Sequence, residues 1–164
     1  MDIDIRGPFL EVASVCEPIL RALPQWFGIE EATAQYIRDT NRLPTLLAAV
    51  GDRVVGFLTL NQHSDYAAEI HVMAVHPDFH RQGIGRALLA EAEQLFRAQG
   101  VEYLQVKTLS PAHPDPHYAR TRRFYLVMGF RPLEEFPELW GSHNPCLQMI
   151  KCLIQQPATK RFTP

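Results

Sequence analysis

The chain has 164 residues and a mass of 18.7 kDa, which fits one domain or one domain with a short tail. It is 46% hydrophobic and 21% charged, a composition typical of a soluble globular protein rather than a disordered one. Its net charge of −2 lacks the basic excess of most nucleic-acid binders, and no stretch approaches the ~20 apolar residues of a membrane helix. We therefore expect no nucleic-acid partner and no membrane partner, and the acidic start of the chain is unlike a secretory signal.

The apolar pattern divides the chain into strands and helices. In chain order it predicts a strand at 3–5, helices at 9–23 and 30–39, strands at 45–50, 54–60 and 67–76, a long helix at 83–99, a strand at 101–107, a helix at 118–128, and strands at 130–136 and 146–153. A strand, a long helix and a further strand form a crossover unit with parallel strands. We therefore expect a mixed α/β fold, with one domain at 1–153 and a polar C-terminal tail at 154–164.

The cysteines and histidines indicate neither a disulfide framework nor a metal site. Cys16, Cys146 and Cys152 are odd in number and form no Cys-x-x-Cys pair. We expect small buried side chains in a reducing compartment, and hence a cytoplasmic protein. No histidine has His-Glu-x-x-His or similar spacing, so no metal is expected.

A strand leads into a turn that contains Gly83 and Gly85, and the turn opens the long helix. The first turn of a helix has N–H groups without intrahelical partners, and the helix dipole adds positive charge there. Arg81 and Arg86 add cationic donors, so the segment could bind a pyrophosphate; the alternative is a tight turn with no ligand. The glycine spacing does not match a Walker loop. It does not match the Gly-x-Gly-x-x-Gly dinucleotide fingerprint either, because Leu88 occupies the third glycine position.

Two motifs carry a resemblance to a known family. Residues 76–89, His-Pro-Asp-Phe-His-Arg-Gln-Gly-Ile-Gly-Arg-Ala-Leu-Leu, resemble the central motif of the GCN5-related N-acetyltransferases (GNAT), which reads Gln/Arg-x-x-Gly-x-Gly/Ala. Residues 124–130, Phe-Tyr-Leu-Val-Met-Gly-Phe, resemble the family's Leu/Phe-Tyr-x-x-x-Gly-Phe. The resemblance implies the GNAT fold, a central mixed sheet of about six or seven strands flanked by helices. It also implies acyltransferase activity with acetyl-CoA as co-substrate.

The resemblance further implies a cofactor site built mainly of main-chain groups. A strand would pair with the pantetheine arm through Met73, Ala74 and Val75. A loop would bind the pyrophosphate through Arg81, Gln82, Gly83, Ile84, Gly85 and Arg86. His80 stands where the family has Gln or Arg. Tyr118 stands where the family often has an Asn that touches the cofactor, and we retain Tyr118 as a candidate cofactor-binding residue.

For catalysis, Tyr125 matches the tyrosine that in many family members protonates the departing CoA thiolate. A phenol, with a pKa near ~10, can share a proton with a thiolate of pKa near ~8.5. The acceptor amine must also lose a proton. Glu69 occupies a position where several family members carry a glutamate base, and strand alternation predicts one face for Glu69, His71, Met73 and Val75. His71 is a second candidate base and a water chain a third, whereas Glu69 could instead be an edge carboxylate facing water.

The family's acceptor site implies a role for the loop between the first two helices and for the last strands, where Trp26, Phe27 and Trp140 lie. Aromatic walls with nearby carboxylates would suit a cationic amine, although these aromatics could simply pack at the edge of the core. We expect an acetyl-CoA-dependent N-acetyltransferase that acts on a primary amine of a small molecule. The alternatives are a protein N-terminal or lysine acetyltransferase and, in another class, a non-catalytic acyl-CoA-binding or sensor module. The last strands could also support a homodimer.

Overall fold

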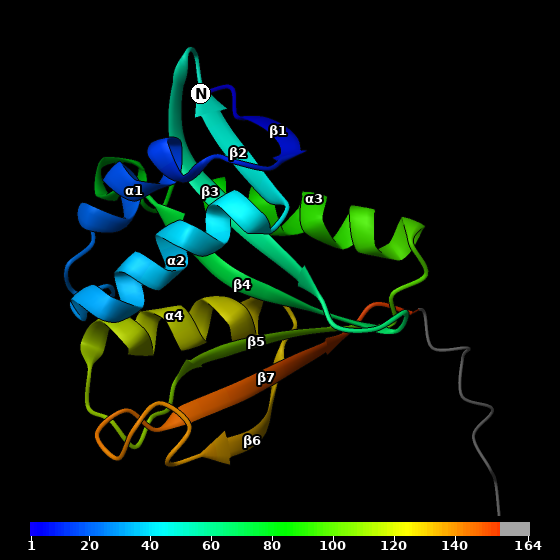
Figure 1. The fold of residues 1–164 in the computed structure, drawn as a ribbon. Coiled ribbons are helices and arrows are strands. Elements are labelled where there is room, and N and C mark those ends of the chain that lie inside the picture. Colours follow the sequence, from blue (N-terminus) through cyan, green and yellow to red (C-terminus); the bar gives the residue numbers. More distant parts are fainter. Residues whose placement is uncertain (155–164) are drawn as a thin grey trace, which may run out of the picture.

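Seven strands form one sheet, in the order β1-β2-β3-β4-β5-β7-β6, in the computed structural model, which describes residues 1–154 (Figure 1). The strands are β1 (Asp4–Phe9), β2 (Thr45–Val50), β3 (Arg53–Gln62), β4 (Ala67–Val75), β5 (Tyr103–Leu109), β6 (Arg131–Phe136) and β7 (Cys146–Cys152). The helices are α1 (Ala13–Arg21), α2 (Glu30–Arg42), α3 (Ile84–Ala98) and α4 (Pro116–Val127), with a 3₁₀ turn, η1, at Pro77–Phe79. The predicted order of elements is confirmed. The polar tail predicted at 154–164 lies, from residue 155 on, outside the described residues.

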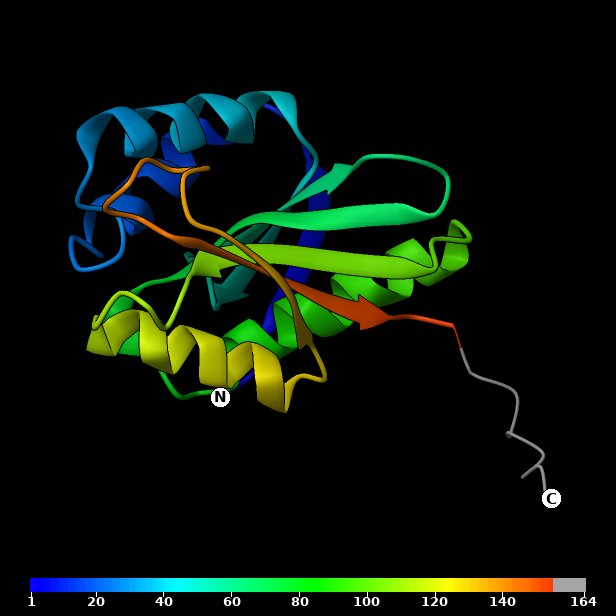
Figure 2. The same ribbon diagram turned by 90° about the horizontal axis from the view of Figure 1, so that it is seen from below.

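The sheet is mixed, as expected. β4 and β5 are parallel, and every other neighbouring pair is antiparallel. The helix α3 connects the two parallel strands, so the predicted crossover unit is confirmed. Helices α1 and α2 cover one face of the sheet, and α3 and α4 cover the other, as Figure 2 shows. None of the helices in residues 1–154 is both long and apolar enough to span a membrane.

The helix α3 forms because its apolar side chains recur on one face. Ile84, Leu88, Ala92 and Phe96 follow at intervals of four residues and are all buried against the sheet. Each fully buried Leu or Phe contributes about 1.5–3 kcal/mol to folding. Gly100 (φ +79°) ends this segment in the left-handed conformation that follows many helices. The helix thereby fixes the start of its first turn relative to β4.

A second core lies on the α1–α2 side of the sheet. It joins Cys16, Ile19 and Leu20 of α1 to Phe57 of β3 and Val72 of β4. This core holds α1 against the centre of the sheet. The connection between α1 and α2 therefore lies near the part of β4 where the predicted site residues are found.

Candidate active site

The first turn of α3 presents main-chain N–H groups that have no acceptor within residues 1–154. Arg81 to Arg86 donate no main-chain hydrogen bond in this part, and Gly83, the N-cap, offers no side chain. Gly83 (φ +86°) and Arg81 (φ +62°) are both left-handed, which turns the chain sharply into the helix. A Cβ at Gly83 would meet no atom within 4 Å, so the space beside it is open. With the helix dipole, this geometry suits an anion.

Next to this turn, β4 and β5 separate. Their last paired residues are Ile70 and Val106, so from His71 to Val75 the edge of β4 that faces β5 has no strand partner. On the β5 side of the opening, Thr108 Oγ1 is buried and makes no hydrogen bond in the described part of the chain. Unpaired main-chain groups and an unpartnered hydroxyl thus border the opening, and a ligand with amide groups could satisfy them.

Three elements converge at this opening. A Cβ added at Gly85 would lie 3.4 Å from Phe124 Cζ and 3.9 Å from Met73 Cε, so α3, α4 and β4 meet there. Tyr125, the next residue of α4, is only 4% exposed and packs edge-on against Phe124 and Phe130, at ring-centroid distances of 5.2 and 5.3 Å. Burial raises the pKa of the Tyr125 phenol, and its hydroxyl makes no hydrogen bond within residues 1–154. Tyr125 is therefore protonated at neutral pH.

The strand β4 carries a bulge at His71. Thr59 of β3 pairs with Val72, and the next β3 residue, Leu60, pairs with Ile70. His71 is left without a partner on β3, which is the mark of a β-bulge. An extra residue of this kind reverses the face on which the following side chains lie.

The predicted single face for Glu69, His71, Met73 and Val75 is therefore wrong. Met73 and Val75 pack against the core under α3. Glu69, whose two neighbours in β4 pack on that same core, points to the opposite side of the sheet, and His71 does too because it bonds to Asp39 of α2. Alternation thus keeps the two candidate bases together on the α1–α2 side, and the bulge moves Met73 and Val75 to the other side.

Glu69 is 6% exposed, so it is not a carboxylate facing water. Lys107 Nζ lies 3.0 Å from its Oε1 and 3.2 Å from its Oε2. Gln105 Nε2 donates to Oε2 at 3.3 Å, and His63 Nε2 also bonds to Oε2. Both carboxylate oxygens therefore already have protein partners.

His71 has a different environment. Its Nε2 lies 2.8 Å from Asp39 Oδ2, and its ring packs edge-on against Tyr36 at 5.6 Å. Gln35 Nε2 donates to the other Asp39 oxygen at 2.8 Å, so α2 holds that carboxylate in place. Burial, followed by the charges of Glu69 and Asp39, raises the pKa of Tyr36. His71 Nδ1 makes no hydrogen bond within the described residues.

The connection between α1 and α2 is tied to α4. Trp26 Nε1 donates to Thr121 Oγ1 at 3.0 Å, and the Tyr118 hydroxyl donates to the Trp26 carbonyl at 2.7 Å. The Trp26 ring also packs edge-on against His80 (5.8 Å) and His117 (4.8 Å). Trp26 therefore bridges the loop before α3 and the start of α4. Burial raises the pKa of Tyr118, so its hydroxyl stays a donor.

The other two predicted acceptor residues have different surroundings. Phe27 packs edge-on against Tyr36, at 5.9 Å, and so borders the cluster around His71. Trp140 lies between β6 and β7, is 39% exposed, and makes no hydrogen bond or aromatic pair within residues 1–154. The structure thus brings Phe27 to the candidate site, whereas no hydrogen bond or aromatic pair within residues 1–154 joins Trp140 to it.

Sequence reasoning did not single out Tyr36, Asp39, Lys107 or Thr108. Tyr36 and Asp39 are three residues apart on α2 and so lie on one face of that helix. This spacing was the available signal for them. Nothing in the local pattern indicates that Lys107 reaches Glu69, 38 positions away.

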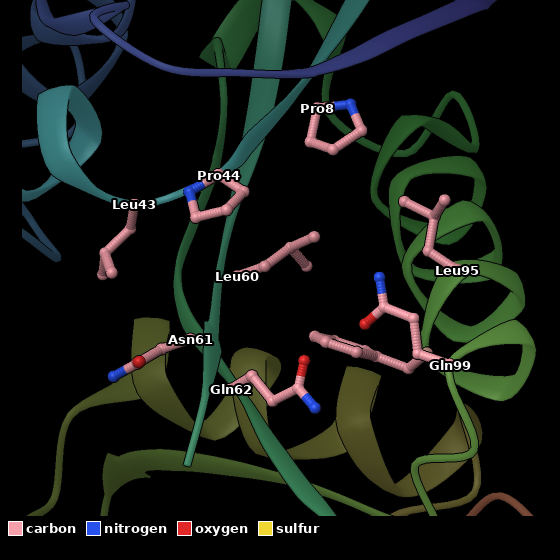
Figure 3. A pocket seen from close by; sticks show the side chains of 9 residues that line it. Pro8, Leu43, Pro44, Leu60, Asn61, Gln62, Leu95 and Gln99 are labelled. Atoms are coloured by element: carbon pink, nitrogen blue, oxygen red, sulfur yellow. The ribbon is translucent and has the colours of Figure 1, made fainter. Parts of the chain in front are cut away.

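A cavity of about 320 Å³ lies at the other end of α3, lined by Leu60, Leu95, Phe96 and Gln99 among others (Figure 3). The helix has 15 residues and is therefore roughly 22 Å long, so this cavity is remote from the turn at Gly83. It contains none of the predicted site residues. Among residues 1–154, no three His, Cys, Asp or Glu side chains are grouped so that they could hold a metal ion.

A family model described as the acetyltransferase (GNAT) family matches residues 13–130, which is most of the chain. The chain belongs to the GNAT family. This GNAT acyltransferase is 27% identical, over 125 residues, to an uncharacterized N-acetyltransferase from Chlorobaculum tepidum, a match that covers 74% of this chain and 70% of that relative.

Solved structures share the GNAT fold. A protein of the GNAT family from Desulfovibrio desulfuricans matches with a TM-score of 0.82 and 18% identity, covering 93% of this chain and 100% of that one. The PaiA N-acetyltransferase from Thermoplasma acidophilum, in complex with coenzyme A, matches with a TM-score of 0.72 and 20% identity, covering 93% and 99%. At these identities the likeness shows the fold alone, and the acceptor of the present GNAT protein has to be argued from its own residues.

Proposed function

We propose that this GNAT protein transfers the acetyl group of acetyl-CoA directly to a primary amine of a small cationic molecule. The observation that carries the proposal is the opening between β4 and β5, which joins two unlike regions. Free N–H groups at Arg81–Arg86 border one side, and Glu69, Asp39 and Tyr36 lie on the other. An anionic cofactor and a cationic acceptor would meet there.

The residues present fit acetyl-CoA. The N–H groups of Arg81–Arg86 would bind its diphosphate, and the unpaired edge of β4 at 73–75 would pair with the amides of its pantetheine arm. The Thr108 hydroxyl, buried without a partner, is available to the same arm. Tyr118, already bonded to Trp26, would contact the cofactor through its ring.

In the transfer itself, the amine nitrogen forms a bond to the acetyl carbon and the carbon–sulfur bond breaks. The attacking amine loses a proton to a base on the α1–α2 side, for which Glu69 and His71 are the candidates. Tyr125 donates its phenolic proton to the departing thiolate, and solvent returns a proton to Tyr125. Burial raises the pKa of Tyr125, so the phenol is still protonated at the pH at which the thiolate forms.

A small acceptor is favoured because the α1–α2 connection is closed against α4. Two hydrogen bonds join Trp26 to Tyr118 and Thr121 of α4, and we expect no open groove for an extended peptide beside them. Phe27 and Tyr36 add aromatic surface beside the carboxylates of Asp39 and Glu69, which suits an alkylammonium group.

The test is an acetyl-CoA assay over a panel of small amines and of peptides with free N-termini or lysines, with release of coenzyme A thiol and product mass as readouts. We expect a mass gain of one acetyl group on a small primary amine. Acetylation of peptides alone would replace the small-molecule assignment. Tight acetyl-CoA binding without thiol release for any acceptor would indicate a binding module.

A cytoplasmic location is part of this proposal, and it is supported by three free cysteines among the described residues. The homodimer through the last strands stays a prediction. It is supported by β6, an edge strand of the sheet whose Leu133 is exposed. Sedimentation of the purified protein over a range of concentrations would test it.

A further inference from the structure

His71 occupies a special position in the sheet. It is the first residue of β4 beyond the last β4–β5 pair, Ile70 with Val106, and it is also the bulged residue that has no partner on β3. Its main chain therefore borders the point where the two strands begin to separate. A thioester that enters the opening to its inner end would lie beside this residue.

The imidazole of His71 is oriented by α2. Asp39 Oδ2 lies 2.8 Å from Nε2, and Tyr36 packs against the ring edge at 5.6 Å. A carboxylate at this distance accepts the Nε2–H and so fixes the tautomer in which Nδ1 carries the free lone pair. Nδ1 has no protein partner among the described residues, and the His71 side chain is 22% exposed. Its lone pair is therefore available to a ligand.

In Glu69, unlike at His71 Nδ1, the acceptor atoms already have partners. Its two oxygens receive hydrogen bonds from Lys107, Gln105 and His63. If the buried carboxylate accepted the proton of an amine, it would lose its charge and leave the ammonium of Lys107, whose side chain is only 27% exposed, without its counter-ion.

We propose that His71 is the base that takes the amine proton, and that Asp39 is a positioning residue that holds His71 in the accepting tautomer. This inference rests on the proposed function. As the amine nitrogen bonds to the acetyl carbon, its proton passes to Nδ1. The resulting imidazolium donates Nε2–H to the Asp39 carboxylate, which stabilises the added charge. Solvent takes the proton from Nδ1 after the product leaves.

Charged and titratable groups face His71 from several elements. Asp39 and Tyr36 project from α2, Glu69 lies two residues earlier on β4, and Lys107 lies across the opening on β5. His63, which precedes β4, is bonded to Glu69. Lys107 and Glu69 offset each other, so Asp39 is the anion in direct contact with the ring. Its removal must make His71 easier to deprotonate.

The experiment compares Asp39→Asn, His71→Gln and Glu69→Gln with a control, Asp52→Asn, which changes an exposed acid in the β2–β3 turn. The readouts are the pH profile of kcat, the KM for acetyl-CoA, and the NMR titration of the His71 imidazole. In Asp39→Asn, which removes the anionic partner of the ring, the acid limb of the kcat profile should move to lower pH, with KM for acetyl-CoA unchanged. His71→Gln should lower kcat by about 10²-fold or more and remove the acid limb of the pH profile. Glu69→Gln should keep that acid limb.

A structural role for Asp39 would lower stability without moving either midpoint, which would overturn the inference. Loss of the limb in Glu69→Gln, or its retention in His71→Gln, would also overturn it while leaving the acetyltransferase function intact. If the wild-type protein acetylates nothing in the panel, the proposed function fails. The imidazole titration of wild type against Asp39→Asn then still decides whether Asp39 controls the proton on His71.

Discussion

Lys107, the first residue of β5 beyond the last β4–β5 pair, donates hydrogen bonds to both carboxylate oxygens of Glu69, which still pairs with Gln105 within the ladder. The pair is mostly buried, with 9% of the Glu69 side chain and 27% of the Lys107 side chain exposed. It joins the two strands at the inner end of the opening, where the sheet's own hydrogen bonds stop.

Lys107→Met should destabilise the protein by about 2 kcal/mol, because it leaves a buried carboxylate with fewer partners. The double variant Lys107→Met/Glu69→Gln should cost less than the sum of the two single variants, since neither charge is then left unpaired. Urea unfolding of the four proteins measures this coupling. Arg6→Met, at an exposed pair with Asp4, is the control and should change stability by less than about 1 kcal/mol. If the changes in unfolding free energy of the two single variants added up to that of the double variant, the prediction would be contradicted.

Gly83 tests the anion site at the start of α3. Its φ of +86° strains any side chain, so a single substitution could act through the backbone alone. Gly83→Asn and Gly83→Asp form a matched pair, because Asn and Asp tolerate this conformation about equally and differ in charge.

Calorimetry should show that Gly83→Asp binds acetyl-CoA more weakly than Gly83→Asn does, by about tenfold or more, because its carboxylate would face the diphosphate. The difference should shrink at high salt, since salt screens exposed charges. Equal affinities for the two variants would mean that the diphosphate binds elsewhere.

The order of elements was predictable because it depends on local signals. The turn at Gly83 and the apolar face of α3 are both visible within a few residues of sequence. The bulge at His71 was not predictable, because it arises from the register between β3 and β4, and alternation within β4 alone gave the wrong face. The bonds from Asp39 to His71 and from Lys107 to Glu69 join residues 32 and 38 positions apart, and only the folded sheet brings them together.

Some helix and strand boundaries in the structure differ from the predicted ones, for physical reasons. The strand β1 runs to Phe9 rather than ending at residue 5, because Phe9 still pairs with Thr45, and α1 begins correspondingly later, at Ala13. The helix α4 begins at Pro116 rather than at residue 118. A proline is tolerated in the first helical turn, and Asp115 caps the helix by accepting the N–H groups of residues 117 and 118.

The three cysteines should differ sharply in reactivity. Burial raises the pKa of Cys16 to about 12 and that of Cys146 to about 11, so both stay protonated and unreactive at neutral pH. Cys152 is exposed at the end of β7. A thiol reagent at pH 7–8 should therefore label one cysteine in the native protein and three after denaturation. Rapid labelling of Cys16 or Cys146 in the native protein would contradict this assignment, and Cys152→Ser should abolish the native signal.

Tyr125→Phe should lower kcat by about 10²-fold and leave the KM for acetyl-CoA nearly unchanged, because the hydroxyl would act on the departing thiolate rather than in binding. The substitution keeps the aromatic packing with Phe124 and Phe130. The hydroxyl has no hydrogen bond in the described part of the chain, so the unfolding free energy should change by less than about 1 kcal/mol. Since burial raises the pKa of Tyr125, ionisation of this group should not lower the wild-type rate below about pH 10. Tyr66→Phe, at an exposed tyrosine, is the matched control and should keep the full rate. A Tyr125→Phe enzyme as fast as wild type would assign protonation of the thiolate to solvent.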